Sequence, residues 1–226
     1  MRQALVGRAQ PRAQRIRARC IASPALTIIA ASLATLGLTG SVGAQTFAAL
    51  PPSSKLAGTG KANPTPAWID FCRRRPGECM IDPAEPKVIA LTPAVLQLLV
   101  TVNRRVNQRI KPMTDLKHWG VIDSWDLPDD GWGDCEDYQL LKRKLLAEKG
   151  LPRRAMRMTV VIDDKREGHA VLMVRTDRGD FILDNKRMSV LPWAQTGYVF
   201  VKREGQDGMA WVSLNGVASP AATANR

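Results

Sequence analysis

The chain has 226 residues, and 45% of them are hydrophobic, so it can form one or two folded domains with a substantial core. This hydrophobic content excludes a wholly disordered chain. The formal net charge of +12 is concentrated at the N-terminus, because residues 1–44 contain six arginines and no acidic residue. Without them the net charge falls by six, to +6, and we expect no nucleic-acid partner.

Residues 1–44 have the three parts of a secretory signal peptide. A basic stretch ends at Arg19, a short apolar run covers residues 25–38, and small residues precede Gln45. The apolar run is short for a membrane span, so the sequence favours a signal peptide cleaved after Ala44 over a retained anchor. We therefore expect a periplasmic or secreted protein.

Three cysteines remain after removal of the signal peptide, which is an odd number for an oxidising compartment. Cys72 and Cys79 are seven residues apart and enclose the turn-forming sequence Arg75-Pro76-Gly77, so they are predicted to form a disulfide. Cys135 is then left as a free thiol. Such a thiol is either buried and inert or kept free because it reacts.

The rest of the chain is predicted to place helices before strands. Residues 45–64 are rich in Pro, Ser and Gly and read as a flexible linker, and 216–226 as a disordered tail. Helices are predicted at residues 66–74, 92–111 and 134–149, with a long structured loop at 113–133. Strands are predicted at residues 156–162, 169–176, 181–184, 198–202 and 210–214. This order indicates one α+β domain over residues 65–215.

Cys135 lies at the start of the helix predicted at 134–149. Unpaired N–H groups and the helix dipole favour an anion there, which predicts a lowered thiol pKa and an oxyanion donor in the Cys135 N–H. The adjacent acids Asp134, Glu136 and Asp137 act in the opposite direction, because like charge disfavours a thiolate. The alternative is a buried structural cysteine.

A nucleophilic cysteine needs a base, and the chain has two histidines. His169 begins one predicted strand and Asp184 ends the next, and parity places both on one face of a hairpin. The sequence leaves open whether they lie directly opposite each other or four residues apart. His118, in the long loop, is the competing base; we favour His169 because a strand pair supplies its carboxylate partner.

These residues resemble a known family. The segments 133–138 (GDCEDY), 168–172 (GHAVL) and 182–185 (ILDN) are similar to those of the bacterial transglutaminase-like cysteine proteinases, whose best-known members are the LapG-type periplasmic proteases. The similarity extends to WIDFC at 68–72, HWG at 118–120 and DSW at 123–125. It implies a papain/transglutaminase-like cysteine protease fold, with N-terminal helices packed on an antiparallel sheet. By motif position it implies a triad of Cys135, His169 and Asp184.

The resemblance also implies a cofactor and partners. LapG-type members depend on calcium, cut a large biofilm adhesin, and are sequestered by an inner-membrane receptor for cyclic di-GMP. Calcium ligation is thereby carried onto Asp134 and Glu136, where a cation would offset the repulsion at the thiol. The alternative is that these acids only cap the helix. Trp125 and Trp132, which precede Cys135, are expected to line a substrate groove.

The sequence thus predicts an exported thiol peptidase that cleaves a protein substrate, with adhesin release in biofilm control as the implied role. Two alternatives remain. A transglutaminase-type acyl transferase would use the same thioester but pass it to an amine. A non-catalytic periplasmic binding module would keep the cleft without the chemistry.

Overall fold

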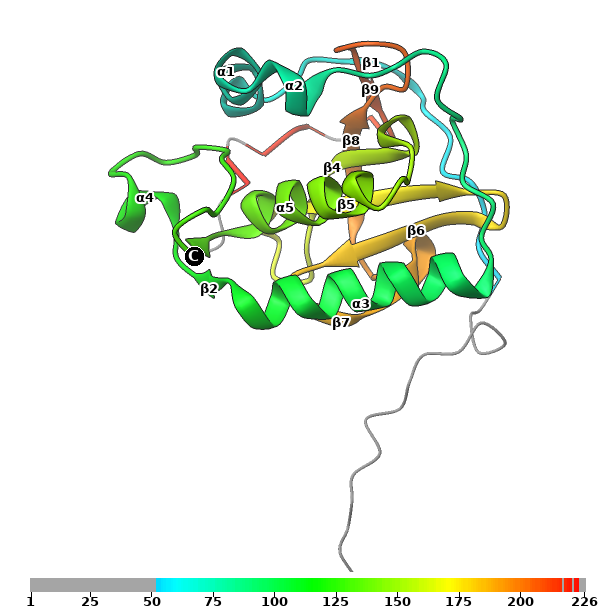
Figure 1. Cartoon of the computed structure of the whole chain (residues 1–226). Coiled ribbons are helices and arrows are strands. Elements are labelled where there is room, and N and C mark those ends of the chain that lie inside the picture. The colour runs from blue at the N-terminus through cyan, green and yellow to red at the C-terminus, as the bar shows by residue number, and fades with distance from the viewer. Residues whose placement is uncertain (1–51, 217, 221, 224–226) are drawn as a thin grey trace, which may run out of the picture. The chain divides into compact units, whose positions relative to one another are not determined.

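A seven-stranded antiparallel sheet forms the centre of the protein, with two long helices side by side on one face (Figure 1). This computed structural model describes residues 52–216, 218–220 and 222–223. The predicted signal peptide, residues 1–44, lies outside the described residues. Within the described part, no helix is long and apolar enough for a membrane span. The predicted α+β class is confirmed, with helices packed on an antiparallel sheet.

The helices begin where the sequence supplies caps. Thr65 and Thr92 accept hydrogen bonds from the backbone N–H three residues later, and a proline occupies the first position of each helix. The three predicted helices are present, and the structure adds two single-turn helices, one of them inside the loop predicted at 113–133. The helices are α1 (Pro66–Arg74), α2 (Pro76–Cys79), α3 (Pro93–Arg109), α4 (Asp115–His118) and α5 (Cys135–Glu148).

The strand order in the sheet is β1-β9-β8-β4-β5-β6-β7. The strands are β1 (Gly60–Ala62), β4 (Met156–Ile162), β5 (Gly168–Thr176), β6 (Gly179–Asp184), β7 (Arg187–Pro192), β8 (Val199–Glu204) and β9 (Trp211–Ser213), while β2 (Lys111–Pro112) and β3 (Trp132–Gly133) form a separate parallel pair. All five predicted strands are present. The edge strands β1 and β7 were not predicted, because neither carries the clean apolar alternation of a half-buried strand.

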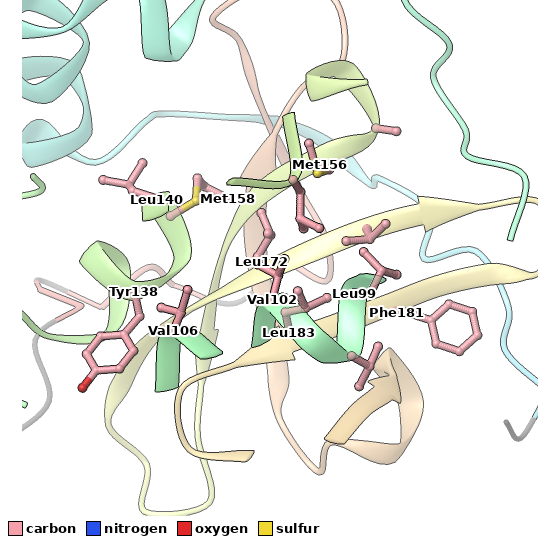
Figure 2. Packing of buried hydrophobic residues seen from close by; sticks show 14 of the residues in the cluster. Leu99, Val102, Val106, Tyr138, Leu140, Met156, Met158, Leu172, Phe181 and Leu183 are labelled. Carbon is pink, nitrogen blue, oxygen red and sulfur yellow. The ribbon is translucent and has the colours of Figure 1, made fainter. Parts of the chain in front are cut away.

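Strand alternation gives the sheet two buried faces. Leu172, Val174 and Leu183 face α3 and α5 and join the main core, part of which is seen in Figure 2. Their neighbours Val171 and Met173 point to the other face, into a smaller cluster. Because β5 and β6 are covered on both sides, a side chain on either face at their ends is shielded from water.

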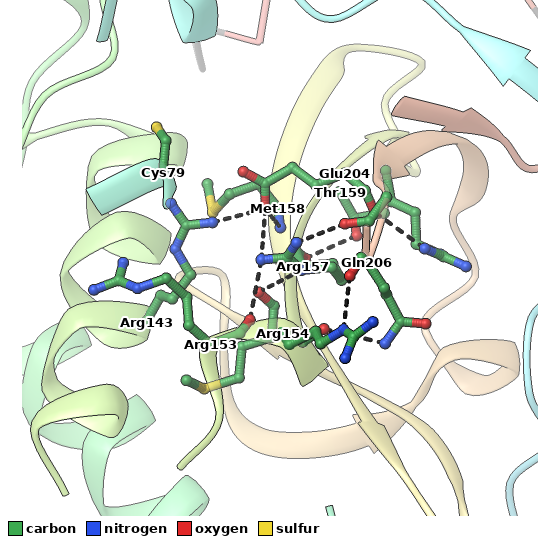
Figure 3. A network of polar contacts seen from close by, with 12 residues as sticks. Cys79, Arg143, Arg153, Arg154, Arg157, Met158, Thr159, Glu204 and Gln206 are labelled. Atoms are coloured by element: carbon green, nitrogen blue, oxygen red, sulfur yellow. Dashed lines mark hydrogen bonds and ion pairs between the residues drawn. The ribbon is translucent and has the colours of Figure 1, made fainter. Parts of the chain in front are cut away.

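A buried ion network fixes the helices to the sheet (Figure 3). Glu204 at the end of β8 accepts hydrogen bonds from Arg143 on α5 at 2.7 Å, from the Trp68 indole on α1 at 2.7 Å, and from the Met158 backbone on β4 at 2.9 Å. Burial opposes ionisation of Glu204, but the Arg143 and Arg157 guanidinium groups hold its pKa below the usual value. The network therefore sets where α5, and with it Cys135, lies on the sheet.

Cys72 on α1 and Cys79 on α2 are joined by a disulfide, with Cα atoms 5.6 Å apart. Closing so short a loop stabilises the folded state by about 2 kcal/mol in the chain-entropy model. Cys135 is the only free cysteine among the residues that the structure describes.

The linker predicted at 45–64 differs from that expectation in its described part. Its residues 60–62 form β1 and pair with β9. Upstream, the Ser53 hydroxyl and the Leu56 N–H donate hydrogen bonds to Asp180, at 2.9 and 2.7 Å. The Pro, Ser and Gly composition was a poor guide here, because backbone and hydroxyl groups can be ordered by a partner distant in sequence.

Candidate active site

The start of α5 is built around the carboxylate of Asp137. Its Oδ2 accepts from the Asp134 N–H at 3.4 Å, and its Oδ1 accepts from the Asp126 N–H at 2.8 Å. A Cβ on Gly133 would lie 2.7 Å from Asp137 Oδ2, so only glycine fits beside this cap. Asp137 is therefore a helix cap, and it places Cys135 in the first helical turn.

The Cys135 thiol is fully buried. It accepts a hydrogen bond from the Ala170 N–H on β5 at 3.3 Å, and two acceptors lie within reach of its single proton, Glu136 Oε2 at 3.1 Å and the Thr223 carbonyl oxygen at 2.6 Å. Burial raises the pKa of the thiol well above its usual value, and the charges of Glu136 and Asp134 raise it further. The lowered thiol pKa expected from the helix start is wrong for this state, because desolvation and two carboxylates outweigh the dipole.

His169 and Asp184 meet at the end of the sheet. His169 Nε2 lies 2.9 Å from Asp184 Oδ1, and the Tyr198 hydroxyl donates to Asp184 Oδ2 at 2.7 Å. Burial opposes ionisation, but the hydrogen bond and charge of His169 lower the pKa of Asp184 to about 2. The other ring nitrogen, Nδ1, is buried and has no hydrogen-bond partner among the described residues.

The register of β5 and β6 explains how they meet. Thr176 pairs with Gly179 and Leu172 pairs with Leu183, so Asp184 falls two residues from direct opposition to His169. This offset differs from both registers left open by the sequence, and the tight turn is at residues 177–178. The shared face from parity holds, and the diagonal separation remains within reach of an imidazole.

His118, the competing base, also has a carboxylate partner. Its Nε2 lies 2.8 Å from Asp130 Oδ2, and its ring stacks on Trp119 at 3.9 Å between centroids. A carboxylate partner therefore does not by itself distinguish His169 from His118. What distinguishes His169 is that the next residue on β5, Ala170, hydrogen-bonds the Cys135 sulfur.

Acidic side chains from three segments gather beside the thiol. Ligand atoms of Asp134, Cys135 and Glu136 lie within 4.8 Å of one another. The same holds for the set of Asp115, Asp123 and Glu136. Asp134 and Glu136 were predicted as metal ligands; Asp115 on α4 and Asp123 in the following loop were not.

Three of these carboxylates each have a buried oxygen with no N–H or O–H donor in reach among the described residues. Asp115 Oδ1, Asp134 Oδ1 and Glu136 Oε1 are buried and have no hydrogen-bond partner in the described part of the chain. Buried polar atoms in folded proteins are nearly always paired, and unpaired charges are especially costly. A cation with oxygen preference fits this donor set, because carboxylate oxygens are its ordinary ligands.

The pKa values of these acids are raised above their ordinary range. Burial, followed by the charge of Asp134, raises the pKa of Asp115 to about 7. Burial raises the pKa of Asp134 to about 6 and that of Glu136 well above its usual value. Bound protons therefore offset part of the negative charge of these acids near neutral pH, as a cation would.

The two tryptophans predicted to line a groove have different surroundings. Trp125 is fully buried, and its indole N–H donates to the Thr223 hydroxyl at 3.2 Å. Trp132 is half-buried, with the Lys111 ammonium 4.9 Å from its ring centroid. Thr223 also contacts the Cys135 thiol, so Trp125 is linked to the thiol through this residue.

Four residues of this site were not predicted from the sequence. Asp115 and Asp123 lie in the acid-rich loop 113–133, whose composition was the only available signal. Tyr198 opens a predicted strand, but its hydroxyl partner depends on tertiary structure. Thr223 belongs to the tail predicted to be disordered, whereas its side chain is 1% exposed in the structure.

Comparisons with known proteins agree with the sequence motifs. A family model described as bacterial transglutaminase-like cysteine proteinase, BTLCP, matches residues 58–219, more than half of the chain. No curated protein matches. Among solved structures, calcium-bound LapG of Legionella pneumophila is 26% identical with a TM-score of 0.47, covering 59% of this chain and 76% of that one. A second structure of the same protein is 28% identical with a TM-score of 0.44, covering 51% and 67%. An EGTA-treated structure is 26% identical with a TM-score of 0.45, covering 54% and 69%.

Proposed function

The chain belongs to the bacterial transglutaminase-like cysteine proteinases, and on that premise we propose that it is an exported thiol peptidase with Cys135, His169 and Asp184 as its catalytic triad. One observation carries the assignment of residues. His169 uses Nε2 for Asp184 and leaves Nδ1 unpaired, while the adjacent Ala170 N–H touches the Cys135 sulfur. A nucleophile, a base with a free nitrogen and an orienting carboxylate thus occupy one buried site.

The reaction follows from these groups. The Cys135 thiol gives its proton to His169 Nδ1 as the sulfur bonds to a peptide carbonyl carbon. The imidazolium then donates that proton to the leaving amine as the C–N bond breaks, which leaves a thioester. Water attacks the thioester while His169 accepts its proton, and the acid and the free thiol are released. Asp184 holds the ring orientation and stabilises its charged form throughout.

The Cys135 N–H, in the first turn of α5, has no acceptor within the helix and is the proposed oxyanion donor. Trp125 and Trp132 are the proposed walls of the substrate groove. For Trp125 this is supported by its indole N–H, which already bonds a chain segment lying on the thiol.

Calcium is the proposed cofactor, held by Asp134 and Glu136 together with Asp115 and Asp123. The unpaired oxygens on three of these acids support it. When bound, calcium would supply positive charge beside the thiol and favour its ionised form. The acids themselves hold the α4 loop against the start of α5, since the Asp115 N–H donates to Asp134 Oδ2 at 3.3 Å.

Hydrolysis is proposed over acyl transfer, with a large surface adhesin as the substrate and a cyclic di-GMP receptor as the regulator. The test is to incubate the protein with the N-terminal region of a neighbouring secreted adhesin and a labelled primary amine. We expect two unlabelled fragments from the wild type and none from Cys135→Ala. Incorporation of the amine at the new carboxyl end without hydrolysis would identify an acyl transferase instead.

A periplasmic or secreted location is proposed from the N-terminal sequence and from the Cys72–Cys79 pair. Intact mass and non-reducing peptide mapping of exported protein should find Gln45 as the first residue. They should also find Cys72 linked to Cys79, with Cys135 alkylated only after unfolding or activation. A Cys135 bridged to either partner would remove the proposed nucleophile.

A further inference from the structure

Thr223, in the predicted C-terminal tail, lies on the Cys135 thiol. The Thr223 carbonyl oxygen is 2.6 Å from the sulfur, and the Thr223 side chain is 1% exposed. The contact joins residues 88 positions apart, so the local sequence of α5 does not impose it. The tail thus brings a backbone carbonyl into hydrogen-bond contact with the proposed nucleophile.

A set of side-chain contacts anchors this carbonyl. The Thr223 hydroxyl accepts from the Trp125 indole at 3.2 Å and lies 2.9 Å from Asp123 Oδ1 and 3.2 Å from Glu136 Oε2. One hydroxyl therefore bridges the wall of the site and two members of the acidic cluster. This is a specific buried seat for a small hydroxyl side chain rather than a loose surface contact.

The preceding tail residues pack against the strand that carries the base. A Cβ on Gly168 would lie 2.1 Å from the Ala222 carbonyl oxygen and 2.9 Å from Pro220 Cβ. Only glycine allows the tail so close to β5, directly before His169. The described tail residues therefore contact both sides of the site, Cys135 on α5 and Gly168 on β5.

We propose that this C-terminal tail is an intramolecular inhibitor, with Thr223 as its anchor and its carbonyl in the place of a substrate carbonyl. The inference rests on the proposed role of Cys135 as nucleophile. The Thr223 carbonyl occupies the space beside the sulfur that a substrate peptide would need. The tail thus excludes a second peptide from Cys135.

The test uses the rate at which iodoacetamide alkylates Cys135 in the full mature chain, read by mass spectrometry. Thr223→Trp cannot fit the buried seat, and we expect it to label at least roughly tenfold faster than the wild type. Thr223→Val keeps the shape but loses the hydroxyl bonds, and about a fivefold increase is expected. Ala218→Trp, at an exposed tail position, is the matched control and should label at the wild-type rate.

A synthetic peptide of residues 216–226 should slow labelling of Thr223→Trp again, because it restores the missing occupant. Equal rates in wild type and Thr223→Trp, with thermal unfolding unchanged, would overturn the inhibitor. So would loss of residues 224–226 from the wild type on incubation, because the tail would then be a substrate. Labelling needs no protein substrate, so fast labelling of Thr223→Trp without adhesin cleavage supports the inhibitor and counts against the proposed peptidase.

Discussion

Alanine at Cys135 or at His169 is expected to abolish peptide-bond cleavage, with a loss of roughly 10⁴-fold or more in kcat. The first change removes the sulfur that bonds to the carbonyl carbon, and the second removes the group that moves its proton. Because the two act as one unit, the double variant should be no slower than the slower single variant. Steady-state cleavage of a peptide substrate measures all three losses, and circular dichroism shows whether the fold persists.

Asp184→Asn tests the residue that orients His169, and His118→Ala tests the competing base. The asparagine side chain would keep the shape but lose the charge that stabilises the imidazolium, and a loss of roughly 10² to 10⁴-fold is expected. His118→Ala should retain wild-type kcat, since its partner is Asp130, outside the triad. An inactive His118→Ala beside an active His169→Ala would refute the assignment.

Chelation with EGTA is expected to stop cleavage and to lower the Tm by about 5 to 10 °C. A ligand present at 100 times its Kd stabilises the folded state by about 2.7 kcal/mol, and about 1 kcal/mol shifts a domain of this size by 2 to 4 °C. Calcium should restore both properties. Magnesium should restore them poorly, because it requires tighter octahedral geometry and gives up water reluctantly. Differential scanning calorimetry in chelexed buffer measures the shift.

Glu136→Gln should raise the Tm of the metal-free protein and remove the stabilisation by calcium. Glu136 is fully buried, and burial together with the charges of the neighbouring acids raises its pKa well above the usual value, so its ionised form destabilises the metal-free protein. The metal-free Glu136→Gln variant should therefore melt above the metal-free wild type, while calcium should no longer raise its Tm. Asp129→Asn, at an exposed acid, is the control and should keep the full calcium response. A metal-free wild type that is as stable as the calcium-treated protein would show that the acids only cap the helix.

The same acids set the pH dependence of the metal-free protein. The pKa of Asp115 is about 7 and that of Asp134 about 6, both above the unfolded value near 4. Between these limits the folded state binds more protons than the unfolded state, so stability falls as pH rises from about 4 to 7. Calcium should remove this fall by replacing the protons. Asp184, with a lowered pKa, acts only below pH 4 and with the opposite sign.

Local signals in the sequence were enough for much of the fold. Thr92 with Pro93 defines the start of α3, and the period-two pattern of Met156–Ile162 defines β4 without error at either end. The exact register of β5 on β6 was not available, because turns at 177–178 and at 178–179 are both compatible with the turn residues present. A shift of that kind moves Asp184 along the strand while leaving its face unchanged.

The sequence predicted those site residues that lie next to Cys135 on the same helix. Asp134 and Glu136 flank Cys135 in sequence, so their effect on the thiol follows from adjacency. Asp115 reaches the same cluster only through α4 and its backbone contact to Asp134, which is a tertiary event. Thr223 could not be predicted for a different reason, because small residues in the tail give no sequence signal of burial. Its hydroxyl is held by Trp125, Asp123 and Glu136, which are distant in sequence.

The short connection between β9 and Thr223 affects how a free peptide competes with the tail for the site at Cys135. Strand β9 ends at Ser213, so only a short tether separates Thr223 from the sheet. A tethered group of this kind acts at an effective concentration on the order of millimolar, whatever the amount of protein present. A free peptide at micromolar concentration would need about a thousandfold higher intrinsic affinity to compete equally. Occupancy of Cys135 would then be governed by how a substrate is presented to the site, and a segment held nearby by a larger anchored partner would have the advantage over a diffusing one.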